Sequence, residues 1–486
     1  MAFIVMVLRV SSAISLQEPL HLVTSGWEQQ PLMGLWLWAN GLPIFNDYFK
    51  LPYYSAHYNW LFYGFYGEVI LGVLSRTTSA PFDWLPTIAR LTTLAALPFI
   101  AWLTYRNFIS LCKTYKPMDG FIHILCVLFA LHIAVGPLIG FWAITARPDV
   151  WALTFEVAAL VIFWNKGKRS FWPLIAAAAC AYLAWALKHN SVIPPITIVL
   201  FAIISRRYLD AALFSGILVS AYSITFLVAS EHYLPSLMQA KLPFLPETGV
   251  RNFVNFAQKS APQFVGLLGL VGVCILKPSI IKQLLRIPTF QFVGILVCVC
   301  FFISIPASTK EGAAENYYFL ASFAMAALTV LSLHVVPHIT KDERVSLFPV
   351  TAITIGWGLH SLALVGLLSG TFGVLSVSST HDSYKSAQKC MALLPRPIHS
   401  SEMYLQLPWM NPSSLLTFTT YNYPLHQSVE NSPYERSGVG GLVREKAFAS
   451  LFLGGPVEAL DGAPLIGYER QPTPCAGRTV YHRIAN

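Results

Sequence analysis

Residues 24–66 read TSGWEQQPLMGLWLWANGLPIFNDYFKLPYYSAHYNWLFYGFY, and the interpretation of the whole chain starts from this stretch. It follows a short apolar segment, 3–16, and precedes a long series of further apolar segments. It holds the carboxylate Glu28 among aromatic and apolar residues, then the turn NGLP at 40–43, and then Asp47. The side of a membrane on which this stretch lies decides what Glu28 can do.

The composition indicates a polytopic membrane protein. Of the 486 residues, 55% are hydrophobic and 11% are charged, and the mean hydropathy is +0.56. Ordinary soluble domains carry about a quarter charged residues, so a water-soluble core could not hide this much apolar surface. The net charge of +9 does not indicate a nucleic-acid partner, because the basic residues stand in short gaps between apolar runs. Neither a zinc-type Cys/His spacing nor a phosphate-loop motif is present in the sequence.

The predicted fold class is an all-α polytopic membrane protein. Together with the first segment, ten further segments predict about eleven transmembrane helices, because about 20 apolar residues cross the hydrocarbon core and open strands cannot satisfy their backbone in lipid. The ten segments are 83–105, 120–138, 149–165, 171–187, 190–205, 209–230, 262–276, 289–306, 317–336 and 345–369. We interpret segment 3–16 as an N-terminal anchor and residues 1–369 as the transmembrane domain.

The basic residues predict the orientation, because cytoplasmic loops carry an excess of Lys and Arg. Alternate gaps are short and basic, and they contain Arg106, Lys113 and Lys116; Lys166, Lys168 and Arg169; Arg206 and Arg207; Lys277, Lys282 and Arg286; and Lys341 and Arg344. This pattern predicts a cytoplasmic N-terminus and a first outer loop at about 17–82. The apolar segment 57–75 would invert the pattern if it crossed the membrane, so we interpret it as an interfacial helix.

Residues 370–486 differ in composition from the rest of the chain. They are polar and rich in Pro, Ser and Gly, which predicts a small extracytoplasmic C-terminal domain. Cys390 and Cys475 both lie in this tail, and a cysteine pair in an exported domain suggests a disulfide between them. Two free thiols are the alternative.

Charged and polar residues at the predicted outer ends of the spans are the candidates for a functional site. They are Glu28, Asp47, Arg147, Asp149, Lys188, Lys310, Glu315, Asn316 and Tyr317. Each has a simpler explanation: Asp149 after Pro148 can cap a helix, and Arg147 and Lys188 can snorkel to the interface. Together they favour a site, because ionisable groups beside membrane spans usually mark substrate pathways.

Four short motifs in this order resemble those of a known class of enzymes. The stretch WEQQPLMGLWLWANGLPIFNDY at 27–48 resembles the first outer loop of the GT-C class of polytopic membrane glycosyltransferases. ARPDVWALTFEVAAL at 146–160, LKHN at 187–190 and ENYYFLAS at 315–322 are similar to later boundary motifs of that class. Within the class, the resemblance is to the dolichyl-phosphate-mannose protein mannosyltransferase and aminoarabinose transferase-like superfamily.

The resemblance implies an inverting glycosyltransferase. Such an enzyme would move a sugar from a polyprenyl-phosphate donor to a lipid, glycan or protein acceptor on the extracytoplasmic face of the membrane. The resemblance carries the general base to Glu28. Gln29 stands where many members have a second carboxylate, so Asp47 and Asp149 stay candidates.

The chemistry of this reaction gives the remaining candidates their roles, because a leaving phosphate departs more easily when fixed cations meet its growing charge. Arg147, Lys188 and Lys310 would bind the donor phosphate, and Glu315, Asn316 and Tyr317 would orient the substrate. The sequence identifies no certain cofactor, and a divalent metal stays open because the candidate site has few carboxylates and no His cluster.

Two other functions are consistent with an apolar chain of this kind. A transporter or flippase of a lipid-linked saccharide usually has paired repeats and interrupted helices. Here only the Pro194–Pro195 pair interrupts a predicted helix, and the candidate charges gather on one side. A membrane scaffold with a binding tail would tolerate Glu28→Gln. The sequence therefore favours the enzyme.

Overall fold

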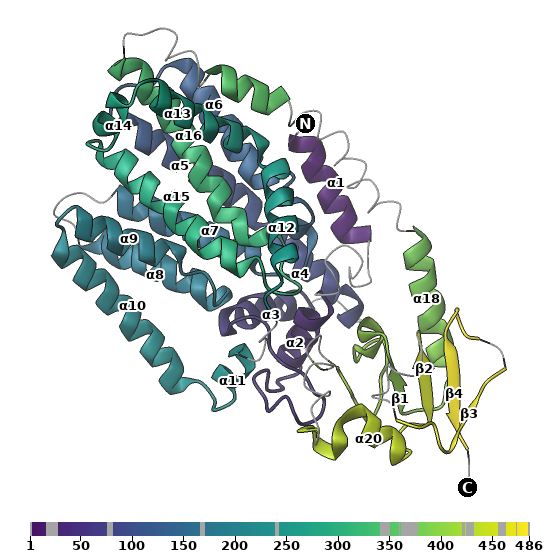
Figure 1. Ribbon diagram of the computed structural model, residues 1–486. Coiled ribbons are helices and arrows are strands. Elements are labelled where there is room, and N and C mark those ends of the chain that lie inside the picture. Colours follow the sequence, from purple (N-terminus) through teal and green to yellow (C-terminus); the bar gives the residue numbers. More distant parts are fainter. Residues whose placement is uncertain are drawn as a thin grey trace. The chain divides into compact units, whose positions relative to one another are not determined.

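The protein is described by a computed structural model (Figure 1). It describes residues 2–15, 28–74, 81–165, 171–238, 243–340, 350–358, 360, 378–419, 423, 432–454, 463–472 and 474–484. Two compact units divide the chain. The helical unit comprises Met1–Ser11, Leu91–Val228 and Leu242–Phe372, and the mixed unit comprises Ser12–Arg90, Ala229–Lys241 and Gly373–Asn486.

Helices dominate the chain, and four short strands lie near its end. In chain order the elements are α1 (Ala2–Ser15), α2 (Gln29–Ala39), α3 (Trp60–Leu74), η1 (Pro81–Trp84), α4 (Leu85–Leu94), α5 (Ala96–Lys113), α6 (Gly120–Val135), η2 (Gly140–Ile144), α7 (Asp149–Trp164), α8 (Trp172–Leu187), α9 (Ile193–Ile204), α10 (Tyr208–Val228), α11 (Tyr233–Met238), α12 (Pro246–Lys259), α13 (Ala261–Leu276), α14 (Ser279–Leu284), α15 (Pro288–Ala307), η3 (Glu315–Tyr318), α16 (Phe319–Ile339), α18 (Ser378–Ala392), β1 (Ile398–Ser400), η4 (Met403–Gln406), η5 (Glu435–Ser437), α20 (Gly438–Arg444), β2 (Ser450–Leu453), β3 (Tyr468–Arg470) and β4 (Thr479–Arg483).

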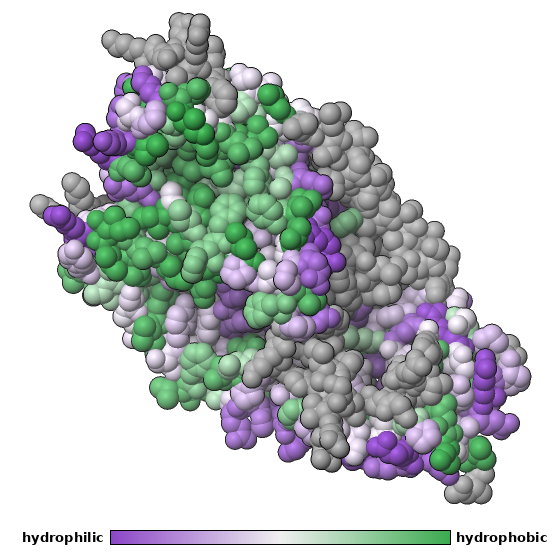
Figure 2. All heavy atoms as spheres, viewed as in Figure 1, coloured by the Kyte–Doolittle hydropathy of each residue, from purple (hydrophilic) through white to green (hydrophobic). Residues whose placement is uncertain are grey.

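Several helices of the helical unit are apolar enough to cross a membrane. In the described part of the chain, four helices meet this criterion by length and composition, and the count becomes five if α12 and α13, which meet at 89°, form one broken span. The surface of this unit is correspondingly apolar, and Figure 2 shows hydrophobic side chains spread over α9, α13 and α15. Exposed examples are Leu200, Leu268 and Phe302. The chain is therefore an integral membrane protein.

The packing of α7 against α8 positions the residues at the start of α7 and at the end of α8. α8 has the sequence WPLIAAAACAYLAWAL, and its small residues Ala177, Ala181 and Ala184 are fully buried. Small side chains let two membrane helices approach closely. Because α8 follows α7 through a short connection, the two helices run in opposite directions. The first residue of α7 and the last residues of α8 therefore lie at the same end of the pair.

In the mixed unit, residues of the predicted first outer loop pack against the C-terminal tail. Tyr53 shares a buried apolar cluster with Tyr423, Tyr434 and Leu451, and its hydroxyl donates a hydrogen bond of 2.9 Å to the backbone oxygen of Glu435. Backbone hydrogen bonds also join the two segments, such as the one from the Phe418 nitrogen to the Pro52 oxygen (2.6 Å). Loop and tail thus build one core, although they are far apart in the sequence.

The close approach of α2 and α3 depends on two glycines. A Cβ atom added at Gly34 on α2 would lie 2.3 Å from the Tyr63 ring on α3, and one added at Gly67 on α3 would lie 2.3 Å from the indole ring of Trp38 on α2. Any larger side chain at either position would push the two helices apart. α3 has 15 residues, and at a rise of 1.5 Å per residue it is about 22 Å long, less than the hydrocarbon core.

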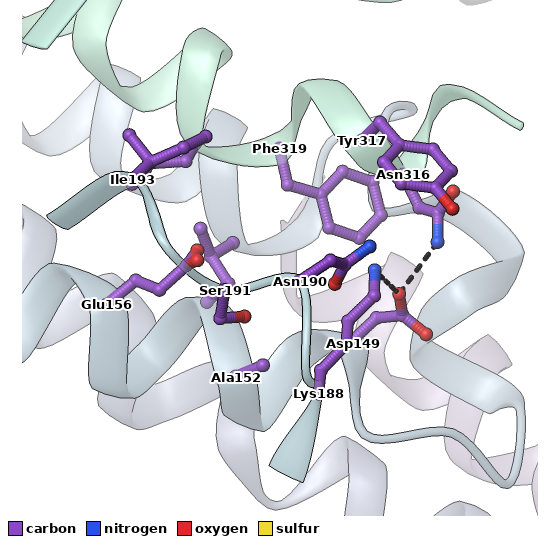
Figure 3. A pocket seen from close by; sticks show the side chains of 12 residues that line it. Asp149, Ala152, Glu156, Lys188, Asn190, Ser191, Ile193, Asn316, Tyr317 and Phe319 are labelled. Carbon is purple, nitrogen blue, oxygen red and sulfur yellow. Dashed lines mark hydrogen bonds and ion pairs between the residues drawn. The ribbon is translucent and has the colours of Figure 1, made fainter. Parts of the chain in front are cut away.

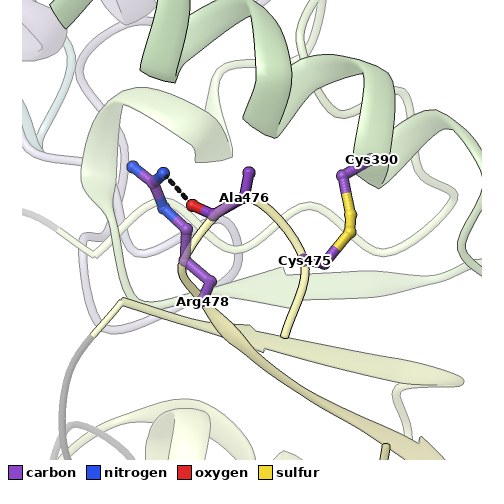
Figure 4. The surroundings of a disulfide bond; sticks show 4 residues. All are labelled: Cys390, Cys475, Ala476 and Arg478. Atoms are coloured by element: carbon purple, nitrogen blue, oxygen red, sulfur yellow. Dashed lines mark hydrogen bonds between the residues drawn. A yellow bond between two sulfur atoms is a disulfide. The ribbon is translucent and has the colours of Figure 1, made fainter. Parts of the chain in front are cut away.

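The tail folds around a four-stranded sheet of order β1-β2-β4-β3. β1 pairs with β2 in parallel, and the other pairs are antiparallel. Cys390 on α18 and Cys475 before β4 form a disulfide with their Cα atoms 6.0 Å apart (Figure 4). This separation lies in the usual range for disulfides. The bridge joins the helix before the sheet to the turn that leads into its last strand.

Candidate functional site

Three predicted site residues come together at the start of α7. Asp149 is the first residue of that helix, Lys188 follows the last residue of α8, and Asn316 lies on η3. The Lys188 Nζ lies 2.5 Å and the Asn316 Nδ2 2.7 Å from the same Asp149 oxygen, Oδ1 (Figure 3). The three residues are up to 167 positions apart in the sequence, so only the packing of the helices brings them together.

The Asp149 carboxylate is buried but not fully engaged. Its side chain is 1% exposed and that of Lys188 is 13% exposed. Within the described residues, the second oxygen, Oδ2, has no hydrogen-bond partner. The Lys188 ammonium also lies 5.3 Å from the centre of the Tyr317 ring. The result is an ion pair in which one buried carboxylate oxygen has no hydrogen-bond partner among the described residues.

Arg147 stands two residues before Asp149 and is held by its own contacts. Its guanidinium lies over the Trp142 ring, 4.7 Å from the ring centre, and close enough to Asp149 to interact with it electrostatically. The Thr93 hydroxyl donates to the backbone oxygens of Thr145 (2.7 Å) and Arg147 (3.3 Å). These bonds fix the backbone of the segment that leads into α7.

A small cavity of about 40 Å³ opens beside the Asp149–Lys188 pair. Its lining residues come from α7, from the connection between α8 and α9, and from η3 and α16, and they are Asp149, Ala152, Leu153, Glu156, Lys188, Asn190, Ser191, Ile193, Asn316, Tyr317, Phe319 and Leu320. Figure 3 shows Glu156 on the side of the cavity away from Asp149, with Ser191 between them. Charged side chains therefore lie on both sides of the cavity, and the rest of its lining combines amide, hydroxyl, aliphatic and aromatic groups.

The other candidates of the same unit lie elsewhere. Glu315 forms an ion pair with Lys259 at the end of α12. Lys310 lies in the segment between α15 and η3, where its backbone bridges to Phe244. Neither residue lines the cavity beside Asp149.

Glu28 lies in the mixed unit and forms a closed ion pair. Arg90 on α4 donates to both of its oxygens, from Nε to Oε1 at 3.0 Å and from Nη2 to Oε2 at 2.7 Å. Both side chains are 0% exposed. Asp47, in the same unit, accepts a hydrogen bond of 3.1 Å from the backbone nitrogen of Phe49 and lies 3.8 Å from Lys50, in a partly exposed turn.

Two buried charged residues, Glu156 and Arg90, were not predicted from the sequence, although each left a signal. Glu156 follows Asp149 by seven residues, which is two helical turns and puts both carboxylates on one face. Arg90 is an arginine within the apolar segment 83–105, and an ionisable group in such a segment usually has a buried partner. Its partner Glu28 is 62 residues away, so the pairing itself could not be foreseen.

The described residues contain no group of three or more His, Cys, Asp or Glu side chains arranged to hold a metal ion. The polar groups that could bind a ligand are instead the charged and amide side chains around the cavity.

Comparisons with known proteins bear on the fold. No protein-family model matches the chain, and no curated protein matches it. Among solved structures, it is similar to ArnT from Cupriavidus metallidurans bound to undecaprenyl phosphate, with a TM-score of 0.60 and 12% identity over 99% of this chain and 97% of ArnT. It is also similar to the oligosaccharyltransferase AglB from Archaeoglobus fulgidus in complex with an inhibitory peptide and a dolichol-phosphate, with a TM-score of 0.49 and 12% identity over 99% of this chain and 74% of AglB. The chain thus shares the fold of ArnT over nearly its whole length, and the resemblance to the GT-C class is confirmed at the level of the fold.

Proposed function

We propose that the protein is an inverting glycosyltransferase that uses a polyprenyl-phosphate sugar as donor. A lipid, glycan or protein on the extracytoplasmic face of the membrane would be the acceptor. The observation that carries the proposal is the convergence of Asp149, Lys188 and Asn316 beside a polar cavity in a membrane-embedded unit. The shared fold with ArnT, whose structure holds undecaprenyl phosphate, supports the donor class.

The proposed reaction needs two kinds of group. The oxygen of the acceptor hydroxyl attacks the anomeric carbon while the bond from that carbon to the phosphate oxygen breaks. The electron pair of that bond leaves with the polyprenyl phosphate, and the hydroxyl proton passes to a carboxylate. Fixed cations that meet the growing charge on the phosphate lower the barrier.

Asp149 is our proposed base. A base must offer a lone pair within hydrogen-bond reach of the proton that it takes. Asp149 has an oxygen without a hydrogen-bond partner among the described residues, whereas Arg90 engages both oxygens of Glu28. We propose that Glu28 instead stabilises the start of α2 through this ion pair.

Arg147 and Lys188 are the proposed phosphate-binding residues. Both lie at the same end of the α7–α8 pair as Asp149, and guanidinium and ammonium groups form strong charge-assisted hydrogen bonds with phosphate. Asn316 would orient Asp149 through its hydrogen bond of 2.7 Å. Lys310 would act through its charge, because its side chain does not line the cavity.

The proposed orientation rests on two observations. Basic residues gather in alternate gaps between the apolar segments, which favours a cytoplasmic N-terminus. The Cys390–Cys475 disulfide favours an oxidising compartment for the tail.

The test compares the wild-type chain with Asp149→Asn in sealed proteoliposomes. The donors are undecaprenyl phosphates that carry glucose, galactose, mannose or arabinose, and the acceptors are membranes from cells that lack the gene. The proposal predicts that the wild type releases undecaprenyl phosphate and that Asp149→Asn does not. Movement of an intact donor across the bilayer without release would indicate a flippase and refute the proposal.

A further inference from the structure

Glu156 is a buried carboxylate that the proposed reaction does not use. It lies two turns after Asp149 on the same face of α7, about 10.5 Å further along the helix axis. It lines the same cavity and is only 8% exposed. An ionisable residue in the middle of a membrane helix is costly, so it usually has a functional reason.

No cation is dedicated to Glu156. The ion pairs among the described residues do not include it, and the nearby ammonium of Lys188 is bound to Asp149 at 2.5 Å. An ionised carboxylate can only accept hydrogen bonds, and Ser191 supplies one of them, so positions for further hydrogen-bond donors remain on Glu156. The cavity beside Glu156 leaves room for a ligand group that donates a hydrogen bond to this carboxylate.

The other lining groups indicate the chemistry of that ligand. Asn190, Ser191 and Asn316 offer amide and hydroxyl groups, which both donate and accept, and Tyr317 and Phe319 offer aromatic surface. Several convergent neutral polar groups with an aromatic wall suit a molecule with many hydroxyls. The cavity of about 40 Å³ has room for only a few water-sized groups, so it fits one edge of a sugar and not the whole ring.

We infer that Glu156 determines donor specificity by accepting a hydrogen bond from one hydroxyl of the donor sugar. This inference rests on the proposed glycosyltransferase function and deepens it. It assigns the side of the cavity that holds Glu156 to a neutral, hydroxyl-bearing sugar. A donor sugar that lacks this hydroxyl would leave the buried carboxylate with the Ser191 hydrogen bond and one acceptor position unfilled. Sites of this kind reject such analogues strongly.

The experiment measures kcat/KM for undecaprenyl-phosphate donors and for their single-deoxy analogues in full-length protein. The variants are Glu156→Ala and Glu156→Gln. Thr154→Val is the matched control. Thr154 is buried on the same helix, and its hydroxyl donates a hydrogen bond of 2.8 Å to the backbone oxygen of Val150 in that helix.

We expect the wild type to prefer the parent donor over one deoxy analogue by about 10²-fold or more. Glu156→Ala should reduce this preference to less than about tenfold, Glu156→Gln should keep part of it, and Thr154→Val should leave it unchanged. An unchanged preference in Glu156→Ala would overturn the inference. A preference for an amino-sugar donor that Glu156→Gln abolishes would also overturn the inference, because the group bound by Glu156 would then be a cation and not a hydroxyl. If the wild type consumes no donor at all, the proposed function fails instead.

Discussion

The buried pairs Glu28–Arg90 and Asp149–Lys188 differ in how many of their carboxylate oxygens accept hydrogen bonds. In the Glu28–Arg90 pair, the guanidinium engages both carboxylate oxygens and both side chains are 0% exposed. In the Asp149–Lys188 pair, the ammonium and Asn316 share one oxygen, the lysine is 13% exposed, and a cavity lies beside them. A pair in which both carboxylate oxygens accept hydrogen bonds stabilises structure. A pair beside a cavity with one oxygen that has no hydrogen-bond partner among the described residues can act on a ligand.

The largest expected effect is on the open pair. Asp149→Asn keeps the shape of the side chain and removes the proton acceptor. We expect kcat to fall by about 10²–10⁴-fold, the usual contribution of a general base, while the stability falls by less than in Glu28→Gln, because Lys188 is 13% exposed. Transfer kinetics and thermal unfolding in detergent check both parts. Full activity in Asp149→Asn would assign the base to another residue.

Removal of the cation from the open pair should have the next largest effect. Lys188→Gln takes away a charge that would stabilise the leaving phosphate, so we expect kcat/KM for the donor to fall by about 10²–10³-fold. The control is Lys277→Gln, because Lys277 Nζ bonds to the Thr340 hydroxyl at 3.0 Å, away from the cavity. Equal losses in the two lysine variants would show a general effect on folding and contradict the proposed role.

The closed pair should respond in stability and not in chemistry. Glu28→Gln leaves the Arg90 guanidinium buried without its counter-charge, which costs about 3–5 kcal/mol of folding free energy. Turnover per folded molecule should stay within about tenfold of the wild type, as measured by kinetics normalised to the folded fraction.

A double variant sharpens this test. Glu28→Leu with Arg90→Met removes both charges, and it should be more stable than either single variant because no charge is left unpaired.

A Glu28→Gln protein that folds like the wild type but transfers no sugar would identify Glu28 as the base.

The smallest expected effect concerns the sheet of the mixed unit, where His399 is buried and its Nδ1 lies 3.1 Å from the Thr417 hydroxyl. Burial lowers the pKa of His399 to about 4 from its ordinary value of 6.5. The unfolded chain therefore takes up a proton first as the pH falls, so stability is constant above about pH 7 and falls by up to about 3 kcal/mol between pH 6.5 and 4.

His399→Gln should flatten this part of the stability profile. Thermal unfolding at pH 7, 5.5 and 4.5 measures the difference between the two proteins. An unchanged slope in the variant would assign the pH dependence to other groups.

The sequence predicted the local features of the open pair well. Asp149 after Pro148 reads as a helix start, and Lys188 and Asn316 stand at the borders of apolar segments. Helices that cross a membrane must begin and end near its surface, so charged residues at their ends are expected at similar depths. The prediction of a GT-C-like fold rested on the order of short motifs around these same helix ends.

The sequence by itself determined that the chain is apolar, helical and embedded in a membrane, because composition and segment length depend only on neighbouring residues. Only the tertiary structure decided which charges meet. It paired Glu28 with Arg90, turned Glu156 toward the cavity beside Asp149, and built one core from Tyr53 and Tyr434. These contacts join residues that are distant in the chain, or select one face of a helix, and both depend on how the helices pack.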